Sequence, residues 1–113
     1  MPDKILVDAV TYQVIKTYDR LIVEGQECNA TVDYNTATIR ISQNADKIGE
    51  GNSAKVLMHE VVHAILHERG LDEETENETL VEELAKGFVN LIRQNPRLID
   101  FVKNFSVEVG GAN

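Results

Sequence analysis

The stretch that decides the fold is Met58-His59-Glu60-Val61-Val62-His63-Ala64-Ile65-Leu66-His67, which contains the pattern HExxH inside an apolar segment. On a helix, His59 and His63 are four residues apart and lie on one face, so both imidazoles can reach one ion. Glu60 is offset by one residue, so its carboxylate can contact a water at that ion without being a ligand. Two neutral imidazoles suit Zn²⁺, and a carboxylate beside an activated water suits hydrolysis. The stretch therefore predicts a zinc site with Glu60 as the catalytic base.

The segment around this motif predicts a central helix. Asn52 and Ser53 are both good N-caps, and Gly70 is typical of the residue that follows a helix C-terminus. We expect the helix to end at Arg69. Its apolar residues cover a broad surface, namely Val56, Leu57, Val61, Ala64, Ile65 and Leu66.

The residues before this helix are patterned as short strands. Residues 5–7 and 11–17 are rich in β-branched and aromatic side chains, although a helix fits the same apolar residues loosely. We expect a turn at Gly25. Residues 28–33 and 37–42 predict a hairpin in which residues 34–36 form the turn.

Within that hairpin, alternation places Ile39 and Ile41 on the inward face. Asn35 tolerates left-handed backbone geometry and is the expected turn residue. Residues 43–52 are rich in Asn, Asp and Gly and predict a loop.

The residues after Gly70 predict helices. A second long helix is expected from residues 72–75 to Gln94, and Asn95 and Pro96 end it and begin a short third helix. Residues 106–113 predict a frayed, flexible tail. The fold class is therefore α+β, with a small antiparallel N-terminal sheet, the HExxH helix, a second long helix and a short C-terminal helix.

Length and composition limit the possible functions. The 113 residues suffice for one domain spanning residues 1–113, and a formal charge of −8 makes nucleic acid an improbable partner. The lone Cys28 predicts a reducing cytosol, so we expect a cytoplasmic protein. We expect no signal peptide and no membrane partner, because no apolar run has the necessary length.

A catalytic zinc needs a third protein ligand. His67 continues the i, i+4 series, but three histidines over two turns spread along about 12 Å of helix axis, too far for one ion. We therefore assign His67 a supporting role, with ligation as the alternative. The remaining candidates are carboxylates of the acidic segment, namely Glu74, Glu76, Glu78, Glu82 and Glu83.

Helical spacing separates these candidates. Glu83 is expected in solvent, nearly opposite the apolar stripe, whereas Glu78 lies at the stripe's edge. An acid inside an apolar face is costly unless it is paired or metal-bound, so Glu78 is the expected third ligand. Glu82, one turn further, is expected to accept the N–H of a ligating imidazole.

The motif and the acidic helix resemble the gluzincin metallopeptidases. Asn77-Glu78 followed by Glu82 looks like the group's second-helix segment, in which a ligand Glu follows Asn and an acid four residues later supports a zinc-bound His. The small size and His67 resemble the ImmA/IrrE family of phage-associated metallopeptidases. The resemblance implies a zincin-like fold. The interval from His63 to Glu78 is shorter than in these families, which leaves Glu82 open as the ligand.

Two functions follow as hypotheses. The first is a zinc-dependent metallopeptidase, a hydrolase acting on a protein or peptide substrate in a phage or prophage setting. The alternative is a non-catalytic zinc-binding interaction module. For the peptidase, residues 37–42 are the expected edge strand that binds an extended peptide. Four side chains are candidate oxyanion donors: Tyr12, Tyr18, Tyr34 and His67.

Overall fold

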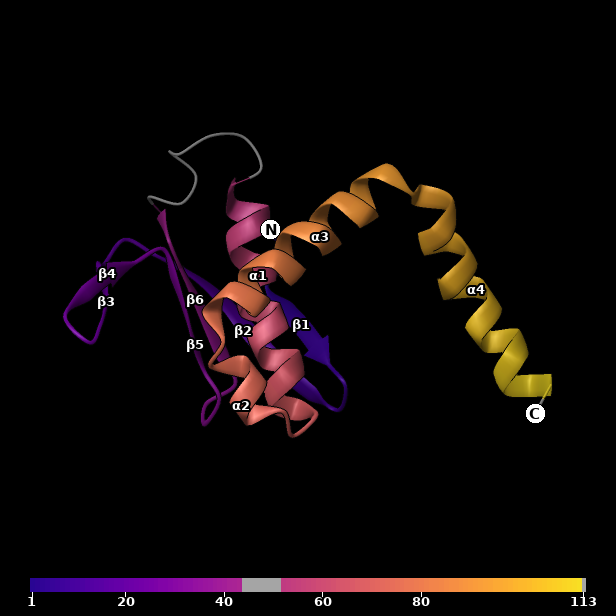
Figure 1. The fold of residues 1–113 in the computed structure, drawn as a ribbon, viewed down its shortest axis with the longest axis horizontal. Coiled ribbons are helices and arrows are strands. Elements are labelled where there is room, and N and C mark those ends of the chain that lie inside the picture. The colour runs from indigo at the N-terminus through magenta and orange to yellow at the C-terminus, as the bar shows by residue number, and fades with distance from the viewer. Residues whose placement is uncertain (44–51, 113) are drawn as a thin grey trace.

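The computed structural model describes residues 1–43 and 52–112, with residues 105–112 described by their backbone alone. Its strands are β1 (Lys4–Val7), β2 (Val10–Thr17), β3 (Leu21–Val23), β4 (Gln26–Cys28), β5 (Ala30–Asp33) and β6 (Thr38–Ser42). Its helices are α1 (Asn52–Glu68), α2 (Asp72–Thr75), α3 (Glu78–Gln94) and α4 (Pro96–Ala112). The protein is mixed α+β with an N-terminal sheet, as predicted (Figure 1).

The sheet is mixed, and the expectation of an antiparallel sheet is wrong in its central pair. The strand order is β1-β2-β6-β5, while β3 and β4 form a separate hairpin. β1 and β2 are antiparallel, as are β5 and β6, but β2 and β6 are parallel. The alternation of apolar and polar residues predicts which face of a strand is buried. It does not predict which strand lies next to it or in which direction that strand runs.

The strand order also corrects the expected edge strand. β6, which covers most of residues 37–42, lies inside the sheet between β2 and β5, so the two edges are β1 and β5. The predicted hairpin is confirmed, because β5 pairs with β6 with Val32 opposite Ile39.

The turns are partly as expected. Glu24 and Gly25 both have positive φ, at 52° and 79°, which is typical of a two-residue hairpin loop and confirms the turn at Gly25. Between β5 and β6 the positive φ falls on Ala37, at 48°, and the expectation for Asn35 is wrong. The Asn35 backbone N–H instead donates to Asp33 Oδ1 at 2.9 Å, and this side-chain contact holds the turn.

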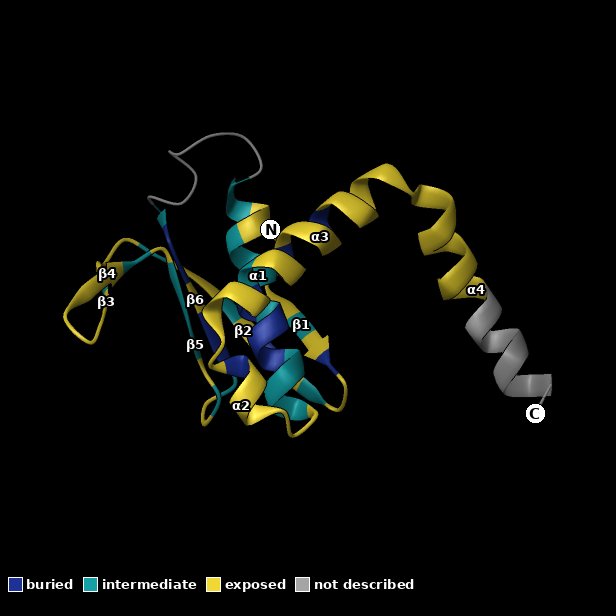
Figure 2. Ribbon diagram, viewed as in Figure 1, coloured by how far each residue is buried: buried dark blue, intermediate teal, exposed yellow. Residues whose placement is uncertain are grey.

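α1 lies between the sheet and α3, and each layer buries a different side of it (Figure 2). The cluster toward the sheet consists of Val7, Tyr12, Ile39, Ile41 and Ala64. The cluster toward α3 consists of Val62, Val81 and Ala85. Each buried aliphatic side chain of this size contributes about 1.5–3 kcal/mol of burial free energy.

α1 ends in a Schellman motif. Gly70 has a φ of 77°, and its N–H donates to the carbonyl of His67 at 3.0 Å. The N–H of Leu71 donates to the carbonyl of Leu66 at 2.8 Å, which completes the motif. The predicted glycine after the helix is confirmed, and it turns the chain back so that α2 and α3 can return over α1.

The expected second long helix is interrupted. α2 ends at Thr75, and α3 begins at Glu78 after an N-cap at Asn77, whose Oδ1 accepts the N–H of Leu80 at 3.1 Å. The expectation of continuity was wrong because a capping asparagine competes with the helix for backbone N–H groups. The interruption determines which carboxylate begins α3.

α4 projects from the end of α3 away from the sheet (Figure 1). It begins at Pro96, directly after the C-cap of α3 at Asn95, as the sequence predicts. It continues to Ala112, so it is longer than the short helix expected, and its range covers residues 106–112 of the predicted tail, whose flexibility stays a prediction. Among the helices described, none combines the length and apolarity needed to cross a bilayer.

Tyr12 links the sheet to the end of α1 and generates a stability prediction. Its side chain is 0% exposed, and its hydroxyl donates to Glu68 Oε2 at 2.6 Å. Tyr12→Phe should lower the free energy of unfolding by about 1–2 kcal/mol, because a partly buried hydrogen bond to a carboxylate is lost. Urea denaturation measures this. Tyr18→Phe is the matched control, since Tyr18 is 90% exposed; equal effects of the two variants would contradict the role of the bond.

Candidate metal centre

Three side chains from α1 and α3 converge on one point. His59 and His63 stand one turn apart on the side of α1 that neither apolar cluster occupies, and Glu78 is the first residue of α3. One ligand atom from each lies within 4.8 Å of the other two, which is close enough to hold a metal ion. Glu74, Glu76, Glu82 and Glu83 are not members of this group.

The Glu78 carboxylate faces both imidazoles at once. Its Oε2 lies 3.1 Å from Nε2 of His59, and its Oε1 lies 3.2 Å from Nε2 of His63. Ligands held at about 2.0–2.1 Å from a tetrahedral ion stand about 3.3–3.4 Å apart, so these separations are compatible with a shared zinc.

The other nitrogen of each ring is engaged by a neighbour. His59 Nδ1 lies 2.9 Å from Glu82 Oε2, and His63 Nδ1 lies 2.8 Å from Thr75 Oγ1. The Thr75 hydroxyl donates to the carbonyl of His63 at 3.3 Å, so its oxygen accepts from the ring N–H. With both protons on Nδ1, both Nε2 atoms carry lone pairs. In that tautomer the two Nε2 atoms and the Glu78 carboxylate are all acceptors, and a bound cation would satisfy them.

Thr75 extends this network to the sheet. Its Oγ1 lies 3.2 Å from the hydroxyl of Tyr34, the residue that follows β5. Thr75 is buried at the end of α2, where its hydroxyl lies within hydrogen-bond distance of the His63 ring nitrogen. The sequence reasoning missed this contact, since a threonine in an acidic run is indistinguishable from other polar residues until the helix break is known.

Glu60 is buried beside the donor group. Removal from water disfavours its charged form and raises its pKa to about 7, and Glu78 adds to the shift while His59 opposes it. Burial acts in the opposite sense on His63 and lowers its pKa, although Glu78 opposes this. Both effects favour neutral groups here, and a neutral imidazole is the form that binds metals.

His67 belongs to a neighbouring contact and not to the donor group. Its Nδ1 lies 2.8 Å from Asp72 Oδ1, and its ring stacks on Tyr34 with 4.0 Å between centroids. Asp72 is a further partner that sequence reasoning missed. Of the other candidate oxyanion donors, Tyr12 is bonded to Glu68 and Tyr18 lies almost fully in solvent.

The structure corrects the reason for choosing Glu78. Its side chain is 69% exposed, so it is not an acid inside an apolar face. The expectation came from treating residues 72–94 as one helix, in which Glu78 would lie mid-helix beside the stripe. At the first position of α3 it lies near solvent, where the helix dipole favours a carboxylate.

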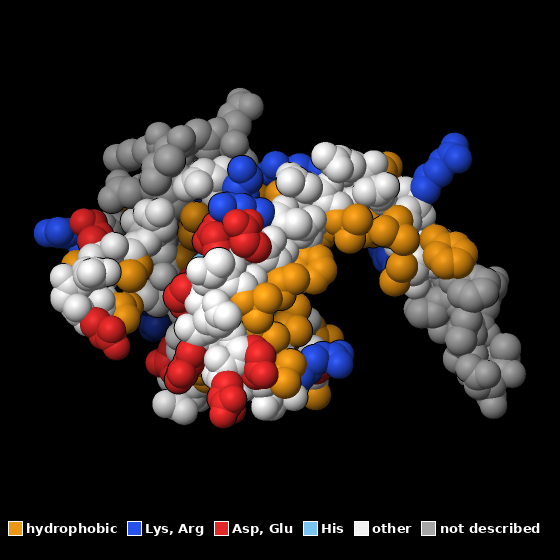
Figure 3. All heavy atoms as spheres, in the orientation of Figure 1, with side chains coloured by type: hydrophobic (Ala, Val, Ile, Leu, Met, Phe, Trp, Pro, Cys, Tyr) orange, Lys and Arg blue, Asp and Glu red, His pale blue; other side chains and the backbone are white. Residues whose placement is uncertain are grey.

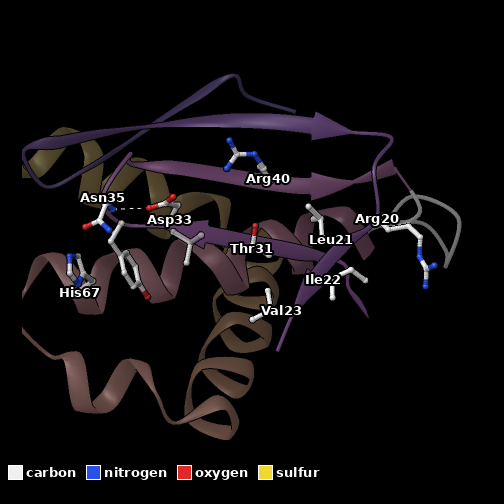
Figure 4. A pocket seen from close by; sticks show the side chains of 11 residues that line it. Arg20, Leu21, Ile22, Val23, Thr31, Asp33, Asn35, Arg40 and His67 are labelled. Carbon is white, nitrogen blue, oxygen red and sulfur yellow. Dashed lines mark hydrogen bonds between the residues drawn. The ribbon is translucent and has the colours of Figure 1, made fainter. Parts of the chain in front are cut away.

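An open groove of about 640 Å³ runs beside β5 and reaches His67 (Figure 4). It is lined by Leu21 and Val23 of the β3–β4 hairpin and by Thr31 and Asp33 of β5. His67 lines the groove too, whereas the three donor residues do not.

No protein family, curated protein or solved structure matches this chain. The interpretation of the site therefore depends on its geometry.

Replacing single carboxylates separates their roles. Glu78→Gln should abolish tight zinc binding, because it removes a donor. Glu82→Gln should weaken binding about 10–100-fold, since it acts through the His59 ring. Glu83→Gln is the matched control and should leave affinity unchanged, because Glu83 is exposed and outside the group. Chelator competition measures these affinities; similar losses in Glu78→Gln and Glu83→Gln would refute the donor set.

The raised pKa of Glu60 predicts a pH-dependent stability of the metal-free protein. Its pKa rises from 4.5 to about 7 on folding, so the folded state holds the proton more tightly. The resulting stabilisation is present below pH 4.5 and is lost as pH rises through 7, amounting to about 3 kcal/mol. Urea denaturation in the presence of a chelator should show that the free energy of unfolding of Glu60→Gln rises relative to that of the wild type between pH 5 and 8. If the free energies of unfolding of the two proteins change in parallel with pH, the raised pKa of Glu60 is contradicted.

Proposed function

We propose that this protein is a zinc-dependent metallopeptidase in which His59, His63 and Glu78 hold the ion and Glu60 is the general base. One observation carries the proposal: the two oxygens of the Glu78 carboxylate lie 3.1 and 3.2 Å from Nε2 of His59 and His63, while the opposite nitrogen of each ring has its own partner. A structural zinc site closes with four protein ligands, whereas a catalytic one has three and an open position. The described residues supply three.

Zinc, when bound there, would supply Lewis-acid polarisation of the scissile carbonyl and activation of a water. Glu60 would take the proton from that water and pass it to the departing amine. Glu82 and Thr75 would hold the two rings in the tautomer that turns Nε2 toward the ion. Tyr34 and His67 remain the candidates for stabilising the developing oxyanion. The hydroxyl of Tyr34 lies beside Thr75, and the ring of His67 contacts Asp72 of α2.

The substrate would be a protein or peptide bound in extended form. β5 is a sheet edge, and the groove beside it leads toward Tyr34 and His67. An extended segment could add to this edge through backbone hydrogen bonds, with side chains in the groove. This replaces the assignment of peptide binding to residues 37–42.

The proposal extends to the class of enzyme. A sheet followed by an HExxH helix and a second helix with the third ligand supports a zincin-like fold of the gluzincin type. The sheet before α1 and His67 after the motif support a place near the ImmA/IrrE family and, with it, a phage or prophage setting. The lone Cys28 supports action in the cytoplasm.

Glu60→Gln tests the enzymatic proposal. The variant should bind zinc as the wild type does, because Glu60 is not a donor, and should cleave an unfolded reporter protein about 10²–10⁴-fold more slowly. Zinc content and cleavage are measured on the same samples, with Glu83→Gln as the control that retains both. A wild type that binds zinc and cleaves nothing would favour the non-catalytic module, and full activity of Glu60→Gln would remove Glu60 from the mechanism.

A further inference from the structure

Arg40, in the middle of β6, is a cation on the face of the sheet opposite α1. Its neighbours along β6 are buried toward α1, so its own side chain points to the other face, where it is exposed. Its partners in register are Ile15 of β2 and Thr31 of β5, and neither is acidic. Arg20 and Arg69 each contact an acid, at 3.1 and 3.0 Å. Arg40 forms no ion pair within the part of the chain that the structure describes.

The groove beside β5 has charges of opposite sign toward its two ends. Arg20 and Arg40 line it toward the β3–β4 hairpin, whereas Asp33 and His67 line it at the end of β5 (Figure 4). His67 contacts Asp72, the first residue of α2, and acidic side chains gather over α2 and the start of α3 (Figure 3). Arg20 already has an ion-pair partner. Arg40 therefore supplies the unmatched positive charge of the groove, at the end that lies away from the acids.

The backbone of β5 offers hydrogen-bonding groups beside this charge. The N–H of Ser42 donates to the carbonyl of Asn29 at 2.8 Å, which fixes the phase of the ladder between β5 and β6. Bonded pairs alternate along an antiparallel ladder, so the N–H and C=O groups of Ala30 and Val32 point to the free edge. An extended segment can pair with these groups while one of its side chains or its terminus reaches Arg40.

We propose that the groove binds an extended peptide segment on the edge of β5 and that Arg40 pairs with a carboxylate of that segment. A guanidinium binds a carboxylate through two parallel hydrogen bonds, whether it belongs to an Asp or Glu side chain or to a chain terminus. Like-charge repulsion from Asp33 and Asp72 disfavours the carboxylate at the other end of the groove. The inference rests on the proposed function in taking this segment to be the substrate, whereas the binding itself needs no metal.

Fluorescence anisotropy on the metal-free protein tests the proposal with labelled six-residue peptides of alternating Thr and Val, amidated at the C-terminus. A single Glu, moved through the six positions, should tighten binding about fivefold at its best position relative to Gln at the same position. Arg40→Gln should abolish this preference. Arg93→Gln is the matched control and should retain it, because Arg93 is an exposed arginine of α3 outside the groove. Circular dichroism shows that each variant is folded.

A peptide that lacks Glu but has a free C-terminal carboxylate distinguishes the two sources of the carboxylate. Tighter binding of this peptide that Arg40→Gln abolishes would support the proposal with a chain terminus as the ligand, and a preference for Glu alone would support it with a side chain. No binding, equal binding of all peptides, or a preference that Arg40→Gln retains would overturn it. Cleavage with zinc is measured separately: peptides that bind through Arg40 but are never cut would contradict the peptidase and leave this inference standing.

Discussion

The contact of the Glu78 carboxylate with both His59 and His63 depends on how α3 is set against α1. Two imidazoles on one helix face follow from helical spacing alone, but the third donor must arrive from another element at ångström precision. Val62 packs against Val81 and Ala85 to fix that approach. Apolar packing therefore positions the acceptors before any ion is present, and the cost of gathering them is offset by burial.

The second consequence of this arrangement is a network that reaches the sheet. Thr75 accepts from the ring of His63 and lies 3.2 Å from the hydroxyl of Tyr34, so α1, α2 and the end of β5 meet at one hydroxyl. The same burial that fixes these contacts shifts two pKa values in opposite directions, upward for Glu60 and downward for His63. One physical cause, desolvation of the charged form, explains both shifts.

Local patterns predicted some features and failed at others for identifiable reasons. Alternation placed Ile39 and Ile41 in the core, because strand geometry alone decides which face a residue occupies. Gly70 marked the end of α1, because glycine adopts the left-handed position without the steric cost of a Cβ. The parallel pairing of β2 with β6 was not predictable, since it depends on where the intervening chain goes. The helix break at Asn77 was not predicted, because in the sequence a capping asparagine cannot be distinguished from a polar residue inside a helix.

The sequence by itself determined the spacing of His59 and His63, the register of Glu60 and the apolar rows of the helices, all of which act through contacts within a few residues. Only the tertiary structure decided which carboxylate meets the imidazoles. The break before Glu78 and the packing of α3 on α1 turn that side chain toward the site and leave Glu83 in solvent. Helical periodicity is local, whereas the approach of two helices depends on the turn between them and on the surfaces that they bury.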